Sequence, residues 1–314
     1  MPTVSILIPA FRPEYLDVCI ASALAQTLAD TEIVVSDDSH GDDVARVVGK
    51  WEDPRIRYLR NPERGIHGAN RDHLLRQARG KYVKFLFDDD YLMPRSVELL
   101  VKTAESTGAR LAFHGRRFVD EAGRTLSSPL AVPAGQVAEI TPERFYVEGV
   151  ARVMNFIGEP SNVLFEAAAL ARFPLPFGAG GRPMRFLTDV ALYRNFFEHG
   201  DRVVGLGFHG SAFRQHAGQT SARDNPFFPA GRYEWETLMR LAVDGGRLTP
   251  TQYASGMQLL AAEYRRHADR YPELAEFLEL GGRPGTSAHY DGRFLELLDL
   301  ADIRFAARRL PVAA

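Results

Sequence analysis

Short apolar runs alternate with stretches of helical periodicity over the first 118 residues of the chain. Apolar strands that alternate with amphipathic helices are typical of a parallel sheet covered by helices. The pattern predicts strands at residues 4–8, 32–36, 56–60, 82–87 and 110–118. It predicts helices between them at residues 14–26, 42–51, 69–78 and 95–106. We therefore expect an α/β fold with a mixed, mainly parallel sheet.

The pattern changes after residue 118. Residues 126–142 are rich in Pro, Ala and Ser, and the Gly-rich stretch at 178–183 predicts a loop. A helix is expected to begin at Thr188 or Asp189, a strand at residues 203–208, and further helices from residue 233 onward, including 253–270 and 294–310. We expect residues 1–118 and 119–231 to form two halves of one domain, followed by a helical C-terminal extension over residues 232–314.

The most informative motif is an acidic triplet, Asp88-Asp89-Asp90, which directly follows the apolar strand ending at Phe87. Adjacent carboxylates repel one another, and burying an unpaired carboxylate is costly, so a cation is expected beside them. A divalent metal that carries a phosphate-containing ligand fits this requirement. The alternative is that these residues cap the helix that begins near Pro94. A cap needs one aspartate, whereas this chain has three.

Composition restricts the partners. The 314 residues carry 38 basic and 40 acidic side chains, for a net charge of -2, so no overall positive field would recruit nucleic acid. The single cysteine, Cys19, excludes an intramolecular disulfide and agrees with a reducing cytoplasm. The N-terminal residues do not resemble a secretion signal, and no apolar run reaches membrane-spanning length. We expect a cytoplasmic protein without a transmembrane segment.

Ligands of open α/β sheets bind outside the carboxyl ends of the strands. This rule places Phe11, Asp38, Asn70 and the acidic triplet along one edge of the predicted sheet. Any anionic ligand must be held locally at such an edge, since the chain as a whole is nearly neutral.

Five motifs in this part of the chain, taken in order, resemble the inverting family 2 glycosyltransferases, which have a GT-A nucleotide-diphospho-sugar transferase fold. They are Val4-Ser5-Ile6-Leu7-Ile8-Pro9-Ala10-Phe11, Ala25-Gln26-Thr27-Leu28, Glu32-Ile33-Val34-Val35-Ser36-Asp37-Asp38-Ser39, Gly68-Ala69-Asn70-Arg71 and Asp88-Asp89-Asp90 up to Pro94. The resemblance is close over the first third of the chain, continues loosely to about residue 221, and does not extend to the helical end.

The resemblance implies a role for each carboxylate of the triplet. Asp89 matches the metal-binding aspartate, Asp88 lies near the ribose, and Asp90 supports the metal site. Such enzymes use Mn²⁺ or Mg²⁺ to stabilise the departing diphosphate, and carboxylate oxygens suit these hard cations. Many relatives have Asp-x-Asp-Asp here, whereas this chain has Phe87 at the first position, so the register within the triplet stays open by one residue.

The resemblance also implies the nucleotide contacts. Asp38 accepts a hydrogen bond from the imide N–H of uracil or thymine, so the donor is expected to be a UDP- or dTDP-sugar. Phe11 and Pro9 flank the base, with core packing as the alternative for Phe11. Asn70 belongs to the same motif as Arg71, which would bind phosphate unless it is an ordinary surface arginine.

Asp189 is the expected catalytic base, because Phe186-Leu187-Thr188-Asp189 falls where the family has its base motif. A base at this position deprotonates the acceptor hydroxyl and implies inversion at the anomeric carbon. The alternative is that Asp189 only caps its helix.

Two further sites follow from the resemblance. His216 matches a histidine that relatives place near the metal or the diphosphate, which favours Mn²⁺, with a plain surface histidine as the alternative. Glu159 and Ser161 lie in the region that lines the acceptor site in relatives.

The sequence thus predicts a metal-dependent, inverting glycosyltransferase that acts on a hydroxyl of a glycan, lipid carrier, protein or small natural product. Two alternatives stay open. One is a sugar-1-phosphate nucleotidyltransferase, which is disfavoured because Pro9-Ala10-Phe11-Arg12-Pro13 replaces a Gly-rich phosphate loop. The other is a noncatalytic sugar-nucleotide-binding or assembly protein, which has no need of Asp189.

The C-terminal helices carry apolar residues and arginines on residues 294–309, with acidic residues between them. Packing on the catalytic domain or on a second subunit is expected, and peripheral contact with an anionic membrane is the alternative.

Overall fold

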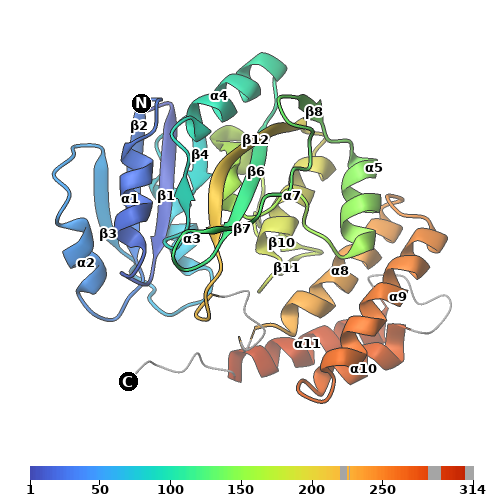
Figure 1. Ribbon diagram of the computed structural model, residues 1–314. Coiled ribbons are helices and arrows are strands. Elements are labelled where there is room, and N and C mark those ends of the chain that lie inside the picture. Colours follow the sequence, from blue (N-terminus) through green and yellow to red (C-terminus); the bar gives the residue numbers. More distant parts are fainter. Residues whose placement is uncertain (220–224, 226, 282–290, 308–314) are drawn as a thin grey trace. The chain divides into compact units, whose positions relative to one another are not determined.

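The computed structural model describes residues 1–219, 225, 227–281 and 291–307 (Figure 1). The chain divides into two compact units. The first, called the sheet unit, comprises Met1–Ile140, Ile157–Pro174 and Phe196–His216. The second, called the helical unit, comprises Thr141–Phe156, Leu175–Asn195 and the described part of Ala217–Ala314.

The sheet unit is built on a sheet of ten strands, counted over the described residues. Eight of them lie side by side in the order β3-β2-β1-β4-β9-β6-β12-β5, while β7 pairs with β6 and β8 pairs with β12. The strands are β1 (Val4–Ala10), β2 (Thr31–Asp37), β3 (Ile56–Arg60), β4 (Tyr82–Phe85), β5 (Tyr91–Leu92), β6 (Leu111–Val119), β7 (Thr125–Ser127), β8 (Val137–Glu139), β9 (Val163–Glu166) and β12 (Val203–Arg214).

The first four strands in space are parallel, with Ile6 of β1 opposite Ile33 of β2 and Lys84 of β4. The apolar residues of β1 are fully buried, as expected for a central strand covered on both faces. Strand β9 is antiparallel to both β4 and β6, and β6 is parallel to β12. The carboxyl ends of β1, β2 and β4 therefore meet at one edge of the sheet.

The helices of the sheet unit are α1 (Leu16–Leu24), α2 (Asp43–Val48), α3 (Ala69–Gln77), α4 (Ser96–Thr107), η3 (Pro160–Asn162) and α6 (Ala167–Leu170). Helix α1 buries Leu16, Cys19, Ile20 and Ala23, the spacing that gives a helix one apolar face. These side chains join β1, β2 and α4 in one hydrophobic core. Helix α4 ends at Gly108, whose φ of 69° suits a residue without a side chain.

The helical unit contains α5 (Pro142–Arg144), η1 (Phe145–Gly149), η2 (Val150–Arg152), the hairpin of β10 (Gly178–Ala179) and β11 (Arg182–Pro183), the start of α7 (Thr188–Glu198), and the helices α8 (Ala230–Asp244), α9 (Pro250–His267), α10 (Glu273–Gly281) and α11 (Gly292–Ala307). The C-terminal helices are drawn in orange to red in Figure 1. Helix α9 begins at Pro250 because Thr249 is its N-cap and forms a capping box with Gln252, while a proline suits the first helical position.

Two buried features hold the helical unit together. Glu236 and Arg240 form a fully buried ion pair at 2.8 Å on α8, and Tyr264 of α9 donates to the same carboxylate. A Cβ on Gly256 of α9 would lie 2.7 Å from the Ala151 carbonyl oxygen, so α9 packs against η2 through a residue without a side chain. These contacts group residues 141–156 with the C-terminal helices, so the units differ from the boundaries expected at residues 118 and 231.

The expected α/β class is confirmed, with each predicted strand and helix of the first 118 residues present within a few residues of its expected ends. The sequence pattern did not predict the antiparallel strand β9 or the helix α10. The end of the predicted helix at residues 294–310 lies partly outside the described residues. Within the described ranges, no helix combines the length and apolar character needed to cross a bilayer.

Candidate active site

The three carboxylates that follow β4 point in three different directions. Asp88 Oδ2 accepts hydrogen bonds from the backbone N–H groups of Phe11, at 2.7 Å, and Arg12, at 2.9 Å. Asp88 therefore ties the acidic loop to the turn that follows β1. Burial, with Asp89 beside it, raises the pKa of Asp88 to about 6.

Asp89 faces the end of β12. Its Oδ2 lies 3.0 Å from Nε2 of His216, two residues beyond the strand. The His216 side chain is 9% exposed and its ring packs 5.4 Å from the ring of Tyr15. The His216 side chain is therefore mostly enclosed by its neighbours, beside the acidic triplet.

Asp90 turns into the interior, where only 1% of it is exposed. Its Oδ1 accepts from the Arg214 backbone N–H at 3.1 Å, while Oδ2 is buried without a hydrogen-bond partner among the described residues. Burial and the neighbouring Asp89 raise the pKa of Asp90 well above its ordinary value. The structure therefore does not bring Asp90 into the pair formed by Asp89 and His216.

Lys84 of β4 is a fully buried cation whose Nζ donates to the Ser161 carbonyl oxygen at 2.7 Å. Burial lowers the pKa of Lys84 to about 7, although the charge of Asp90 acts in the opposite direction. The Ser161 hydroxyl also accepts from the Phe87 N–H at 3.1 Å. Ser161 therefore braces the strand end that carries the triplet.

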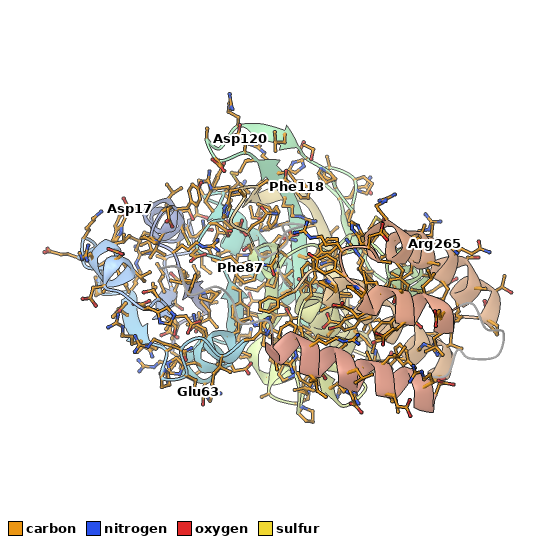
Figure 2. The ribbon with its side chains drawn as sticks, turned by 90° about the horizontal axis from the view of Figure 1, so that it is seen from below. Asp17, Glu63, Phe87, Phe118, Asp120 and Arg265 are labelled. Atoms are coloured by element: carbon orange, nitrogen blue, oxygen red, sulfur yellow. The ribbon has the colours of Figure 1, made fainter. Side chains whose placement is uncertain are left out.

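Arg214 joins the acidic loop to the β6–β7 turn (Phe87 and Asp120 are labelled in Figure 2). Its Nε donates to the Asp89 carbonyl oxygen at 3.0 Å, and its Nη1 donates to the Glu121 carbonyl oxygen at 2.7 Å. The guanidinium also lies 4.4 Å from the ring centre of Tyr15, within the range of a cation–π contact. This buried side chain fixes the strand end that leads to His216.

Asp38 follows β2 and is held by Asn61, which is buried. Asn61 Nδ2 donates to Asp38 Oδ1 at 2.7 Å, and the N–H of Gly65 approaches the same oxygen at 3.4 Å. Burial raises the pKa of Asp38. The arrangement engages one carboxylate oxygen and orients the other.

The other residues expected to contact the nucleotide differ in exposure. Phe11 is 44% exposed, so it is not a core residue, whereas Pro9 is half-buried within β1. Asn70 donates from Nδ2 to the Ser36 carbonyl oxygen at 2.9 Å, and its buried Oδ1 accepts no hydrogen bond from the described residues. Arg71 is half-buried and lies over Gly68.

Glu159, from the expected acceptor region, pairs with Arg116 of β6. Its Oε2 lies 2.6 Å from the Arg116 Nε, and both side chains are largely buried. Gly158, with a φ of 95°, lies directly against the Arg116 guanidinium, where a Cβ would collide with it. The segment before η3 is therefore closely packed on β6.

Asp189 belongs to the helical unit and stands in the first turn of α7. Its Oδ1 accepts from the Val190 N–H at 2.8 Å, and its Oδ2 accepts from Asn155 Nδ2 at 2.7 Å. Asn155 follows Val153, whose φ of 55° is uncommon for a β-branched residue. Both carboxylate oxygens are thus oriented, which is more than a helix cap requires.

The two side chains that meet after β4 suit a divalent cation that takes only a few of its ligands from the protein. Asp89 offers a carboxylate oxygen and His216 an imidazole nitrogen, both of which are ligands for Mn²⁺. No group of three or more His, Cys, Asp or Glu side chains arranged to hold a metal occurs within the described ranges. A cation at this pair would need further oxygens from a diphosphate or from water, as is usual at phosphate-binding sites.

Comparison with known proteins agrees with this fold. Residues 5–156 match the model of glycosyl transferase family 2. The chain is 33% identical to the Escherichia coli chondroitin synthase over 132 residues, which are 41% of this chain and 19% of that protein. It is 33% identical to the uncharacterized glycosyltransferase EpsJ of Bacillus subtilis over 234 residues, which are 73% of this chain and 65% of that protein.

Among solved structures, S. aureus TarS 1–349 in complex with UDP-GlcNAc superimposes with a TM-score of 0.58 at 18% identity, over 94% of this chain and 81% of that one. This likeness confirms the GT-A fold. The family-model match and the glycosyltransferase relatives support assignment of the chain to glycosyltransferase family 2. The chain spans only a fifth or less of the length of the chondroitin synthases that it matches.

The sequence pattern did not single out Asn61, Lys84, Asn155 or Glu234, the last of which accepts hydrogen bonds from the backbone just before α7. Of these four residues, only Lys84 could have been noticed in the sequence, because it is a charged residue inside an apolar strand. The other three look like ordinary polar residues in the sequence, and each is distinguished only by a hydrogen-bond partner far along the chain.

Proposed function

We propose that the protein is an inverting, divalent-metal-dependent glycosyltransferase that moves a sugar from a UDP- or dTDP-sugar to a hydroxyl of a glycan, lipid carrier, protein or small natural product. The contact between Asp89 and His216 carries this proposal, because it joins two cation ligands at the carboxyl edge of the sheet, where α/β folds bind nucleotides. The family match supports the reaction class.

Two features support the donor. Asp38 presents an oriented acceptor, and its backbone N–H bonds to the carbonyl oxygen of Ala10, the residue before the exposed Phe11. An acceptor and an aromatic ring suit the N–H edge and the face of uracil or thymine. A structural neighbour of the same fold, TarS 1–349, is known in complex with UDP-GlcNAc. UDP-GlcNAc is therefore the first donor to test, followed by UDP-glucose and dTDP-glucose.

The chemistry is divided among these residues. When bound at Asp89 and His216, a divalent cation supplies the positive charge that stabilises the departing diphosphate. Asp38 and Phe11 position the nucleotide, and Asp189 accepts the proton of the acceptor hydroxyl as that oxygen attacks the anomeric carbon. Attack from the face opposite the leaving group inverts the configuration.

The test uses UDP release from UDP-GlcNAc with Mn²⁺ or with EDTA, on the parent and on Asp189→Asn, with Asp269→Asn as an exposed control in the helical unit. We expect release with Mn²⁺ only, a loss of at least about 100-fold in Asp189→Asn, and no change in the control. Thermal shift should show that Asp189→Asn still binds the donor. Equal turnover by parent and Asp189→Asn would remove the base from the proposal.

The stereochemistry has its own readout. Proton NMR of the sugar released from the α-linked donor, recorded before mutarotation, should show the β anomer first. Initial release of the α anomer would exclude the inverting mechanism.

A further inference from the structure

Glu234 of α8 is a buried carboxylate with an unusual set of partners. Only 3% of the residue is exposed. Its Oε1 accepts from the Arg185 N–H, and its Oε2 accepts from the N–H groups of Phe186, at 3.0 Å, and Leu187, at 2.6 Å. One carboxylate thus binds three consecutive backbone N–H groups that come just before α7.

The N-cap position of helix α7 is occupied by a leucine. The Leu187 carbonyl oxygen accepts the first helical hydrogen bond, from the Ala191 N–H at 3.0 Å, so Leu187 occupies the N-cap position. A leucine side chain cannot accept a hydrogen bond, and the residue three positions later, Val190, cannot complete a capping box. Glu234, from another helix, accepts from the Leu187 N–H, which is the N-cap donor that the glutamate of a capping box binds.

Asp189 lies two residues after this bound turn. Its carboxylate accepts from Val190 N–H on one oxygen and from Asn155 Nδ2 on the other. The direction of the Asp189 side chain therefore depends on the backbone at residues 187–190, which Glu234 holds on its N-terminal side.

A second brace acts on the loop upstream of the turn. Asn195 of α7 donates from Nδ2 to the carbonyl oxygens of Leu175, at 3.2 Å, Pro176, at 3.0 Å, and Gly178, at 3.3 Å. The Gly-rich hairpin that leads to Asp189 is thus fixed to the helix that carries Asp189. Glu234 binds the backbone of residues 185–187, which connect the hairpin to the helix.

We propose that Glu234 is a positioning residue for Asp189, which it serves by fixing the turn at residues 185–187 so that the Asp189 carboxylate is held in place for proton transfer. The inference rests on the proposed function, in which Asp189 is the base. A buried carboxylate is a costly way to hold a turn, since burial penalises its charged form. The arrangement gives a rigid connection between α8 and the residue that takes the proton.

The test compares Glu234→Gln with Glu236→Gln. Both changes neutralise a buried carboxylate of α8, but Glu236 binds Arg240 and Tyr264 and has no hydrogen bond to residues 185–187. For Mn²⁺-dependent UDP release from UDP-GlcNAc, we expect Glu234→Gln to lower kcat by about 10- to 100-fold. The KM for UDP-GlcNAc should stay within about twofold, because the donor is bound by residues of the sheet unit. Glu236→Gln should leave kcat within about twofold.

Hydrogen exchange gives a second readout that does not depend on activity. The amides of residues 185–187 should exchange faster in Glu234→Gln and not in Glu236→Gln. If Glu234→Gln does not fold, Glu234→Asp serves in its place, because it keeps the charge and shortens the reach. That variant should fold and show the same selective loss of kcat and of amide protection.

The outcomes separate this inference from the proposed function. Wild-type kcat and wild-type amide protection in Glu234→Gln, with Asp189→Asn inactive, overturn the positioning role alone. An equal fall of kcat in both glutamine variants also overturns it, because general loosening of α8 would then be the cause. Full activity of Asp189→Asn overturns both proposals together.

Discussion

His216 Nε2 lies 3.0 Å from Asp89 Oδ2, although 127 positions separate the two residues along the chain. The contact forms because Arg214, two residues before His216, donates from its guanidinium to the Asp89 carbonyl oxygen and from its backbone to Asp90. The end of β12 is thereby fixed to the loop after β4. A carboxylate and an imidazole therefore meet at the carboxyl edge of the sheet.

His216→Ala should raise the Mn²⁺ concentration required for half-maximal UDP release by about 10-fold or more, because an imidazole ligand is lost. Titration of UDP release against Mn²⁺ measures this effect. His209→Ala is the matched control, since His209 also belongs to β12 but bonds to the Ser128 carbonyl oxygen at an exposed position. An unchanged Mn²⁺ requirement in His216→Ala would exclude a metal-ligand role for this residue.

Asn61→Ala should weaken UDP binding by about 5- to 10-fold, because Asp38 then loses the hydrogen bond that orients it. Calorimetric titration with UDP and CDP measures the affinities and tests whether the loss comes from the hydrogen bond between Asp38 and the base. CDP, which lacks the imide N–H, should bind weakly to the parent and change little in the variant. Asp43→Asn, at an exposed residue of α2, is the control. Parallel losses for both nucleotides would contradict the orienting role of Asn61 and point to a general loss of local structure.

Arg214→Lys should lower the free energy of unfolding by about 1 to 3 kcal/mol, because a lysine cannot reproduce the separate bonds to Asp89 and Glu121. Denaturant unfolding measures the loss. Arg117→Lys, at an exposed residue of β6, should change stability by less than about 0.5 kcal/mol. Equal stabilities of the two variants would contradict the anchoring role.

Stability should fall as the pH rises because of Glu234. Burial raises the pKa of Glu234 from 4.5 to about 7, against the opposing effect of the three N–H groups. The folded protein holds this proton more tightly than the unfolded chain does. The stabilisation is therefore complete below about pH 4.5 and is lost as the pH rises through about 7.

The shift corresponds to about 3 kcal/mol. Denaturant unfolding of the parent and of Glu234→Gln between pH 4.5 and 8 measures the contribution of Glu234 to the free energy of unfolding, because the other buried carboxylates are common to both proteins. The free energy of unfolding of the parent should decline by about that amount relative to the variant. Parallel pH profiles would show that Glu234 is ionised throughout.

The strands and helices of the first 118 residues could be predicted because their signals are local. The buried run Val4–Ala10 and the apolar face of α1 follow from spacing alone. The positions of Asp38 and Asp89 at strand ends follow from the same pattern together with the rule for parallel sheets. The sequence determined in this way the class of fold, the edge of the sheet at which a ligand is expected and the residue types available there.

The tertiary structure decided which of those residues act together. It turned Asp90 into the interior and left Asp89 beside His216, and it placed Asn61 on Asp38. It also inserted β9 between β4 and β6, and it placed a glutamate of α8 on the three backbone N–H groups just before α7. Each of these features joins segments far apart in the chain, and such pairings depend on packing and burial rather than on periodicity, which reports only the neighbours of a residue along its own helix or strand.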